Sequence, residues 1–217
     1  IYLSNNVTAI GEYAFYGCTS LSSVSVSMNI SDIGIYAFAE CVRLETAEIK
    51  SSLAAIPVGL FSGCISLSST NIPYSVTAIG KYAYYNNTKL TKVVIPAAVS
   101  KIGEFAFWNN TVLSEINFPD ALRSIERYAF YACASFTDVV LPNGITSIGD
   151  YAFAMCIKMT SINIPDQIET LGTAVLDKAT MLSTLSLPSQ LKLLSLFSTE
   201  EAIPVAVTTV NYTKGNG

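Results

Sequence analysis

The sequence predicts an α/β repeat solenoid, in which one short unit is copied and stacked along an axis. Two observations predict it: aliphatic anchor residues recur every 23 residues, and the residues around each anchor recur with them. The anchors are Ile10, Ile33, Ile56, Ile79, Ile102, Ile125, Ile148, Leu171 and Leu194. We number the coils 1 to 9 by these anchors. We expect residues 1–217 to form a single solenoid of about nine repeats.

A strand is predicted in each coil by an alternation of apolar residues. In coil 4 it runs from Leu90 to Pro96, where Val93 and Ile95 are two residues apart and share one face. Proline lacks an N–H group and so ends the ladder. Strands that recur every 23 residues should stack into a parallel sheet.

The segment after the anchor predicts short helical turns on the other side of the solenoid. In coil 4, Ala83, Tyr84 and Asn87 would share one face of a helix. Glycine follows the anchor in six coils, but Pro57 takes that position in coil 3. Because proline holds φ near about −65°, we expect glycine here to permit close approach between coils rather than a positive φ.

The two ends of the chain depart from the regular unit. Ile1 falls in frame with Val24, so the sequence opens inside a repeat. We expect residues 1–9 to be a partial first repeat and the chain to be a fragment or processed form. Residues 171–217 lose the consensus, with Leu176 in the aromatic position, and should form degenerate repeats or a C-terminal cap.

The composition excludes two classes of partner. Hydrophobic residues make up 51% of the chain, but no apolar run approaches the roughly 18 residues that span a bilayer. The net charge is −4, and the 12 Lys and Arg residues are scattered. Because binding to phosphates needs a basic stripe, we expect no nucleic acid and no membrane insertion by this segment.

The cysteines form one column, eight residues after the anchor. They are Cys18, Cys41, Cys64, Cys133 and Cys156, with Asn87 and Asn110 in the same column in coils 4 and 5. A shared column indicates structure rather than a catalytic thiol. We expect free, buried side chains that hydrogen-bond to the backbone of the turn. Disulfides between coils are the alternative, but side chains that point in parallel suit them poorly.

No catalytic or metal-binding constellation is present. The chain has no histidine, which excludes Ser-His-Asp and Cys-His catalysis and metal sites that contain histidine. Glu45 and Glu48 lie close together on one strand, where two exposed acids are usually just solvated. We therefore expect a protein that is not an enzyme and has no cofactor.

The repeat unit has the form L-x-x-I-x-I-P-x-x-V-x-x-I-G-x-x-A-F-x-x-C and resembles the BspA-like (Treponema-type) leucine-rich repeat family from residue 1 to about residue 190. The resemblance implies a right-handed leucine-rich repeat superhelix with parallel strands. It also implies an extracellular or cell-surface location, since the family occurs in surface proteins of gut, oral and parasitic microbes. Many members are suspected adhesins that bind host matrix or other cells.

A binding patch on a solenoid is expected where the repeats differ on the exposed sheet. Coils 4 to 7 differ there, at Lys92, Val94, Glu115, Asn117, Asp138, Val140 and Asn163. The alternative is sequence drift on a solvated face.

A second candidate is an aromatic ladder of Tyr85, Trp108 and Tyr131 on the turn. Such rings could stack on sugars or seat a partner protein, or could simply cover the apolar interior.

Together with the family resemblance, which alone implies the surface location and adhesion, the sequence predicts a non-catalytic surface or secreted protein that binds a protein or glycan ligand, in adhesion to host matrix or neighbouring cells. The alternative is a passive spacer or an intracellular scaffold with no ligand of its own. Unpaired thiols favour the reducing compartment that this alternative implies.

Overall fold

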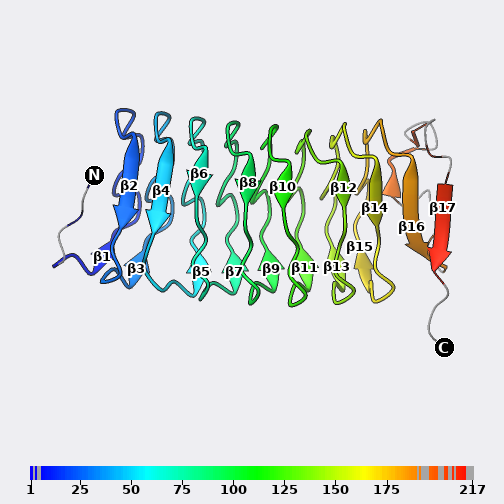
Figure 1. Ribbon diagram of the computed structural model, residues 1–217, viewed down its shortest axis with the longest axis horizontal. Coiled ribbons are helices and arrows are strands. Elements are labelled where there is room, and N and C mark those ends of the chain that lie inside the picture. Colours follow the sequence, from blue (N-terminus) through cyan, green and yellow to red (C-terminus); the bar gives the residue numbers. More distant parts are fainter. Residues whose placement is uncertain are drawn as a thin grey trace.

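The computed structural model is an elongated stack of coils, with residues 9–10 near one end and residues 209–213 at the other (Figure 1). It describes residues 1, 3, 6–189, 191, 196–199, 203, 204, 207 and 209–213. The predicted anchor Leu194 and the last four residues lie outside the described residues.

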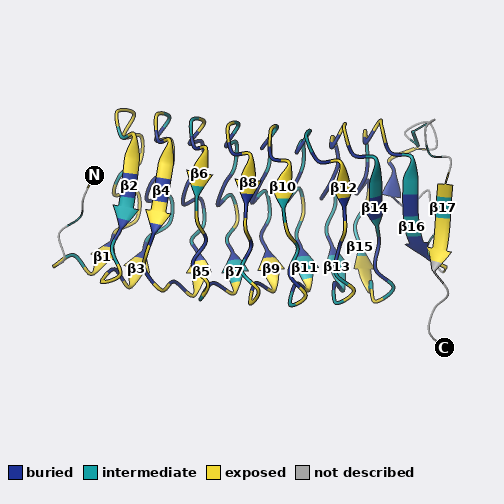
Figure 2. Cartoon of the chain, viewed as in Figure 1, coloured by how far each residue is buried: buried dark blue, intermediate teal, exposed yellow. Residues whose placement is uncertain are grey.

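The predicted strands form the first of two rows (Figure 1). They are β2 (Ser23–Val26), β4 (Thr46–Ile49), β6 (Ser69–Thr70), β8 (Lys92–Val93), β10 (Glu115–Ile116), β12 (Asp138–Val139), β14 (Ser161–Asn163), β16 (Thr184–Pro188) and β17 (Thr209–Thr213). All pairs within this row are parallel, and Val93 and Ile95 are both buried as predicted. We call the outward surface of this row the variable face; Figure 2 shows exposed residues on β4, β8, β10 and β12 there.

The second row is formed by the anchors themselves, which the sequence analysis took only as an apolar column. Its strands are β1 (Ala9–Ile10), β3 (Asp32–Ile33), β5 (Ala55–Ile56), β7 (Ala78–Ile79), β9 (Lys101–Ile102), β11 (Ser124–Ile125), β13 (Ser147–Ile148) and β15 (Thr170–Leu171). Strands β5 to β15 form one continuous parallel sheet, the anchor sheet, in which Ile79 is opposite Ile102. This sheet holds coils 3 to 8 in register, whereas β1 and β3 form a separate pair.

The predicted helical turns are wrong, because the described residues contain no α-helix. Instead, the N–H groups after the anchor alternate between two kinds of partner. Ala83 donates to the carbonyl of Gly80 in its own coil at 3.2 Å, whereas Tyr84 donates to Ala106 in the next coil at 2.8 Å. A helix would direct every N–H group along its own axis and give up the bonds between coils. The neighbouring coil therefore selects a run of β-turns.

These turns place aromatic residues in the left-handed region of backbone space. In one column φ lies between 53° and 57°, at Tyr13, Tyr36, Tyr82, Phe105, Tyr128 and Tyr151. This conformation costs an ordinary residue about 1–2 kcal/mol. Stacking between neighbouring coils offsets the cost, since the ring centroids of Tyr128 and Tyr151 are 4.9 Å apart.

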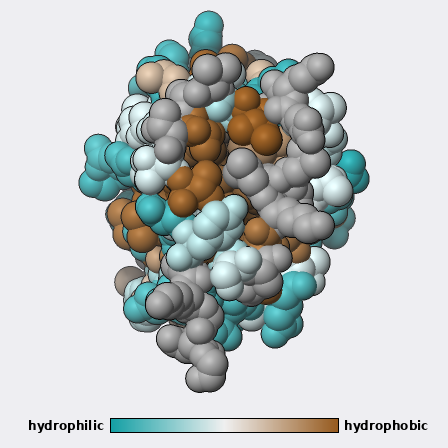
Figure 3. Space-filling view, turned by 90° about the vertical axis from the view of Figure 1, so that its right-hand side faces the viewer, coloured by the Kyte–Doolittle hydropathy of each residue, from teal (hydrophilic) through white to brown (hydrophobic). Residues whose placement is uncertain are grey.

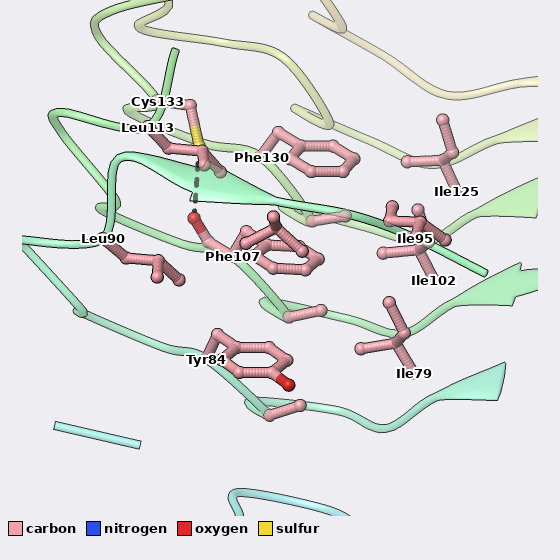
Figure 4. Packing of buried hydrophobic residues seen from close by; sticks show 14 of the residues in the cluster. Ile79, Tyr84, Leu90, Ile95, Ile102, Phe107, Leu113, Ile125, Phe130 and Cys133 are labelled. Carbon is pink, nitrogen blue, oxygen red and sulfur yellow. Dashed lines mark hydrogen bonds between the residues drawn. The ribbon is translucent and has the colours of Figure 1, made fainter. Parts of the chain in front are cut away.

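The interior is a stack of columns (Figure 4). Tyr84, Phe107 and Phe130 stack at centroid distances of 5.2 Å, and a row of anchors lies beside them. Figure 3, which looks onto the end that carries β17, shows hydrophobic residues mostly near the centre and hydrophilic ones around the rim. The buried hydrophobic residues from Ile10 to Phe197 form one cluster, so the core is continuous along the axis.

Two column predictions are confirmed. A Cβ atom on Gly103 would lie 2.7 Å from the backbone nitrogen of Lys81, so glycine here permits close approach. All five cysteines are free. The thiol of Cys133 donates to the carbonyl of Phe107 at 3.2 Å (Figure 4).

The column has three further features. The side-chain amide of Asn110 donates to Tyr84 in the same way, at 2.8 Å. Asn87, by contrast, is buried with no side-chain partner among the described residues. Cys18, in the first coil, is exposed, which corrects the prediction for that residue.

The regular spacing ends at the last strand. Thr184 of β16 pairs with Thr209 of β17, so this step is 25 residues long. The prediction of an uninterrupted 23-residue register therefore fails in coil 9, where the sequence had already lost its consensus.

Candidate binding surface

The charged candidates of the variable face are exposed and lie on consecutive strands. Lys92 and Glu115 pair across β8 and β10, with a distance of 2.8 Å between Nζ and Oε2. Asp138 on β12 faces the other way along the axis, since its carboxylate accepts hydrogen bonds from Ser161 at 2.6 Å and Thr160 at 3.2 Å. Each charge is thus bonded to a neighbouring coil.

The two asparagine candidates act as bridges between coils. The side-chain oxygen of Asn117 accepts from the N–H of Ile95 at 2.7 Å, and its amide donates to the carbonyl of the same residue at 2.8 Å. Asn163 makes the same pair of bonds with Leu141, at 2.7 and 2.9 Å. One side chain thereby replaces two backbone hydrogen bonds of the ladder.

Valine takes the place of this asparagine in alternate coils. The column reads Asn71, Val94, Asn117, Val140 and Asn163 in coils 3 to 7. Asn71 bridges back to coil 2 through Ile49, but a valine has no polar group with which to bridge. Val94 and Val140 are instead 62% and 76% exposed.

The strand row is broken at these two valines. It divides into β2-β4-β6, β8-β10 and β12-β14-β16-β17, so β6 is not paired with β8, and β10 is not paired with β12. At the second break, Glu115 of β10 and Asp138 of β12 occupy the same position of neighbouring coils, where like charges repel. We call the junctions between coils 3 and 4 and between coils 5 and 6 the open junctions.

Each open junction contains a hollow. The first has a volume of about 690 Å³ and a mostly apolar lining that includes Ile72, Tyr74 and Val94. The second, of about 310 Å³, is lined among others by Phe118 and Val140. Two shallower hollows lie over coils 2–3 and coils 4–5, and each shares lining residues with the first hollow. The hollow over coils 4–5 also shares lining residues with the second one. The variable face is therefore grooved from coil 2 to coil 6.

Tyr74 is a residue that the sequence reasoning missed. Its side chain is 86% exposed at the first hollow. The signal was available, because Tyr74 is the only aromatic residue of its column in coils 1 to 8, where the column reads Met28, Ser51, Tyr74, Ala97, Asp120, Asn143, Asp166 and Ser189.

The aromatic ladder lies apart from these hollows, none of which it lines. Trp108 stacks on Tyr85 at 4.6 Å and on Tyr131 at 6.0 Å, with ring planes within 8° of parallel. Burial raises the pKa of the Tyr85 hydroxyl. Both faces of the indole are thus covered by neighbouring rings, and the ladder presents mainly ring edges to a ligand.

Two further searches found nothing in the part of the chain that the structure describes. No three Cys, Asp or Glu side chains gather closely enough to share a metal ion. No helix there could cross a bilayer.

Comparison with solved structures supports the fold. A leucine-rich repeat protein from Bacteroides ovatus aligns with a TM-score of 0.76 at 24% identity, over 95% of this chain and 64% of that one. The chain therefore spans just under two thirds of that relative. The leucine-rich repeat protein of T. pallidum aligns with a TM-score of 0.60 at 26% identity, over 70% of this chain and 72% of that one. The pneumococcal vaccine antigen PcpA aligns at 0.52 and 17% identity, over 95% and 72%.

Comparison of sequences identifies the family. No curated protein matches the chain. The sequence profile described as BspA type leucine rich repeat region matches residues 1–114 and 100–201, in six copies. These matches cover most of the described coils, so the chain belongs to the BspA-type leucine-rich repeat family.

Proposed function

We propose that the chain is a non-catalytic binding module of a surface or secreted protein, and that its variable face holds a protein or glycan ligand in adhesion to host matrix or other cells. The observation that carries this proposal is the pair of open junctions. They interrupt an otherwise regular sheet, and each exposes an apolar side chain beside a hollow. The surface location rests on the family.

The apolar lining supports binding. Tyr74 and Val94 both line the first hollow, and both are mostly exposed. Each would release ordered water when a ligand covers it, at roughly 25 cal/mol per Å² of apolar surface. Binding sites characteristically combine such surface with a few polar groups, which here include Lys92 and Asn71.

The test is a binding screen of the purified chain against arrayed glycans and matrix proteins. For each ligand that binds, we expect Tyr74→Ser and the double variant Lys92→Ala/Asp138→Ala to weaken binding at least about tenfold, which corresponds to 1.4 kcal/mol. Trp108→Ala is the matched control on the turn side and should bind like the parent. If Trp108→Ala is the only variant that loses binding, the binding site is the aromatic ladder rather than the variable face.

The rival function is a spacer or intracellular scaffold. One observation favours it: four of the five thiols are buried and unpaired, as suits a reducing compartment. If no arrayed ligand binds above background, the spacer is preferred.

A further inference from the structure

We propose that the two open junctions are recognition slots for a primary carboxamide, the side chain of an asparagine or glutamine on a protein partner. This inference rests on the proposed function and names its ligand class. The chain itself shows the chemistry, because Asn71, Asn117 and Asn163 fill the equivalent slots at the junctions that are closed.

The backbone groups that those asparagines satisfy are unsatisfied at the open junctions. At a closed junction, the N–H and C=O of Ile95 both bond to Asn117. The equivalent residues at the open junctions are Ile72 and Phe118, and no group in the described part of the chain bonds to the N–H or C=O of either. Each of them lines the hollow of its own junction. The slots therefore offer one donor and one acceptor side by side.

The burial of Ile72 makes these groups costly to leave unpaired. The residue is only 9% exposed, so solvent reaches it mainly through the hollow. A buried backbone N–H or C=O group without a hydrogen-bond partner destabilises the folded chain. A ligand that supplies both bonds recovers this cost, which favours a specific occupant over a merely apolar one.

The geometry selects among amides. The N–H and C=O of one residue in a strand point to the same side. A primary carboxamide carries an N–H on the same side as its oxygen and can meet both at once, as Asn117 does. A trans secondary amide, such as a peptide bond or the N-acetyl group of a sugar, directs its N–H and C=O to opposite sides. A carboxylate has no donor. The slot therefore favours the side chains of asparagine and glutamine over secondary amides and carboxylates.

The spacing of the slots predicts a motif. They are two coils apart, which at ~4.8 Å per coil is about 10 Å. A peptide in the polyproline II conformation rises about 3.1 Å per residue with three residues per turn, so carboxamides three residues apart share one face and would reach both slots. Around the first slot, Tyr74, Val94 and Ala97 provide an apolar lining, which favours apolar residues beside the carboxamide.

The direct test titrates the intact chain with three small probes, propionamide, N-methylpropionamide and propionate, and follows backbone amides by NMR. We expect propionamide alone to shift the amides of Ile72 and Phe118. Val94→Asn should close the first slot and abolish the response of Ile72 while that of Phe118 persists, and Val140→Asn should do the reverse. Val94→Ala is the matched control and should keep both responses.

The reciprocal variant tests the same idea without filling a slot. Asn71→Val should open a third slot, so that the amide of Ile49 begins to respond to propionamide. Equal responses to all three probes, or an Ile72 response that survives Val94→Asn, would overturn the proposal.

Selection of peptides from a display library separates this inference from the function on which it rests. We expect at least tenfold enrichment of Asn or Gln pairs three residues apart, lost when the double variant Val94→Asn/Val140→Asn is the target. If peptides bind the variable face without this enrichment, the carboxamide proposal is wrong but the proposed binding function is retained. If no peptide is selected and no ligand binds in the screen, both the carboxamide proposal and the proposed binding function are wrong.

Discussion

The anchor sheet and the variable face are built from the same repeat, yet only the first is continuous. The anchor column is aliphatic in every described coil, and β5 to β15 pair without a break. The variable face has one column that alternates between asparagine and valine, and its row of strands breaks at each valine between coils 3 and 7. Between coils 3 and 7, pairing of the strands on the variable face thus follows a single position in each coil.

The largest expected effect lies in the shared core. Phe107→Ala should lower the free energy of unfolding by about 3–5 kcal/mol, because it leaves a cavity between Tyr84 and Phe130. Val94→Ala on the variable face should change it by less than about 0.5 kcal/mol. Urea denaturation measures both. Similar costs for the two variants would contradict the idea that the core carries the stability.

The next effect tests the column that distinguishes the two regions. Asn117→Val removes both bonds to Ile95 and should cost about 1–3 kcal/mol. Val94→Asn should instead stabilise the chain by about 1 kcal/mol, because it supplies the missing bridge to Ile72. The comparison is again by urea denaturation. If both variants lose stability, the junctions do not depend on the hydrogen bonds that an asparagine makes to the preceding coil.

A smaller effect concerns pH. Burial raises the pKa of the Cys41 thiol to about 11 and also raises that of Cys64, Cys133 and Cys156. Unfolded thiols lose their protons near pH 8.5, whereas these stay protonated in the folded chain. The contribution of these thiols to stability should therefore be constant below about pH 8, and stability should fall as the pH rises towards 11.

Thiol labelling checks the same arrangement. An aromatic disulfide reagent should label exposed Cys18 at once and the four buried thiols only on unfolding. Cys18→Ser is the control, and rapid labelling that persists in it would contradict the predicted protection.

The smallest effect is expected at the exposed pair of Lys92 and Glu115. Both side chains are more than half exposed, at 59% and 65%, so solvent screens their attraction. Lys92→Ala should shift the melting temperature by less than about 2 °C, and the shift should vanish in 1 M salt. A large shift would mean that this ion pair, rather than Asn117, closes its junction.

Much of the fold could be predicted from spacing alone. The 23-residue interval gave the stack, the parallel strands, the close approach at glycine and the thiol column, because each depends on one coil repeating its neighbour. The helical turns were mispredicted because Ala83, Tyr84 and Asn87 satisfy a helical pattern within one coil. The N–H group of Tyr84, however, donates to Ala106 in the next coil, and a pattern read within one coil does not contain that partner.

The candidate site was predictable in outline. The sequence singled out Val94 and Asn117 as irregular but treated them alike, as outward positions. Their opposite effects appear only when the asparagine is seen to reach back to the preceding coil. Tyr74 was overlooked because it lies after the strand, outside the columns that were compared.

The alternation of Asn71, Val94, Asn117, Val140 and Asn163 also constrains how such a chain can change length in evolution. The asparagines are 46 residues apart, which is two coils. Deletion of coil 4 would place Asn117 beside coil 3 and erase the first slot, whereas deletion of coil 5 would set two valine coils side by side. Only gain or loss of coils in pairs therefore preserves the alternation of closed and open junctions.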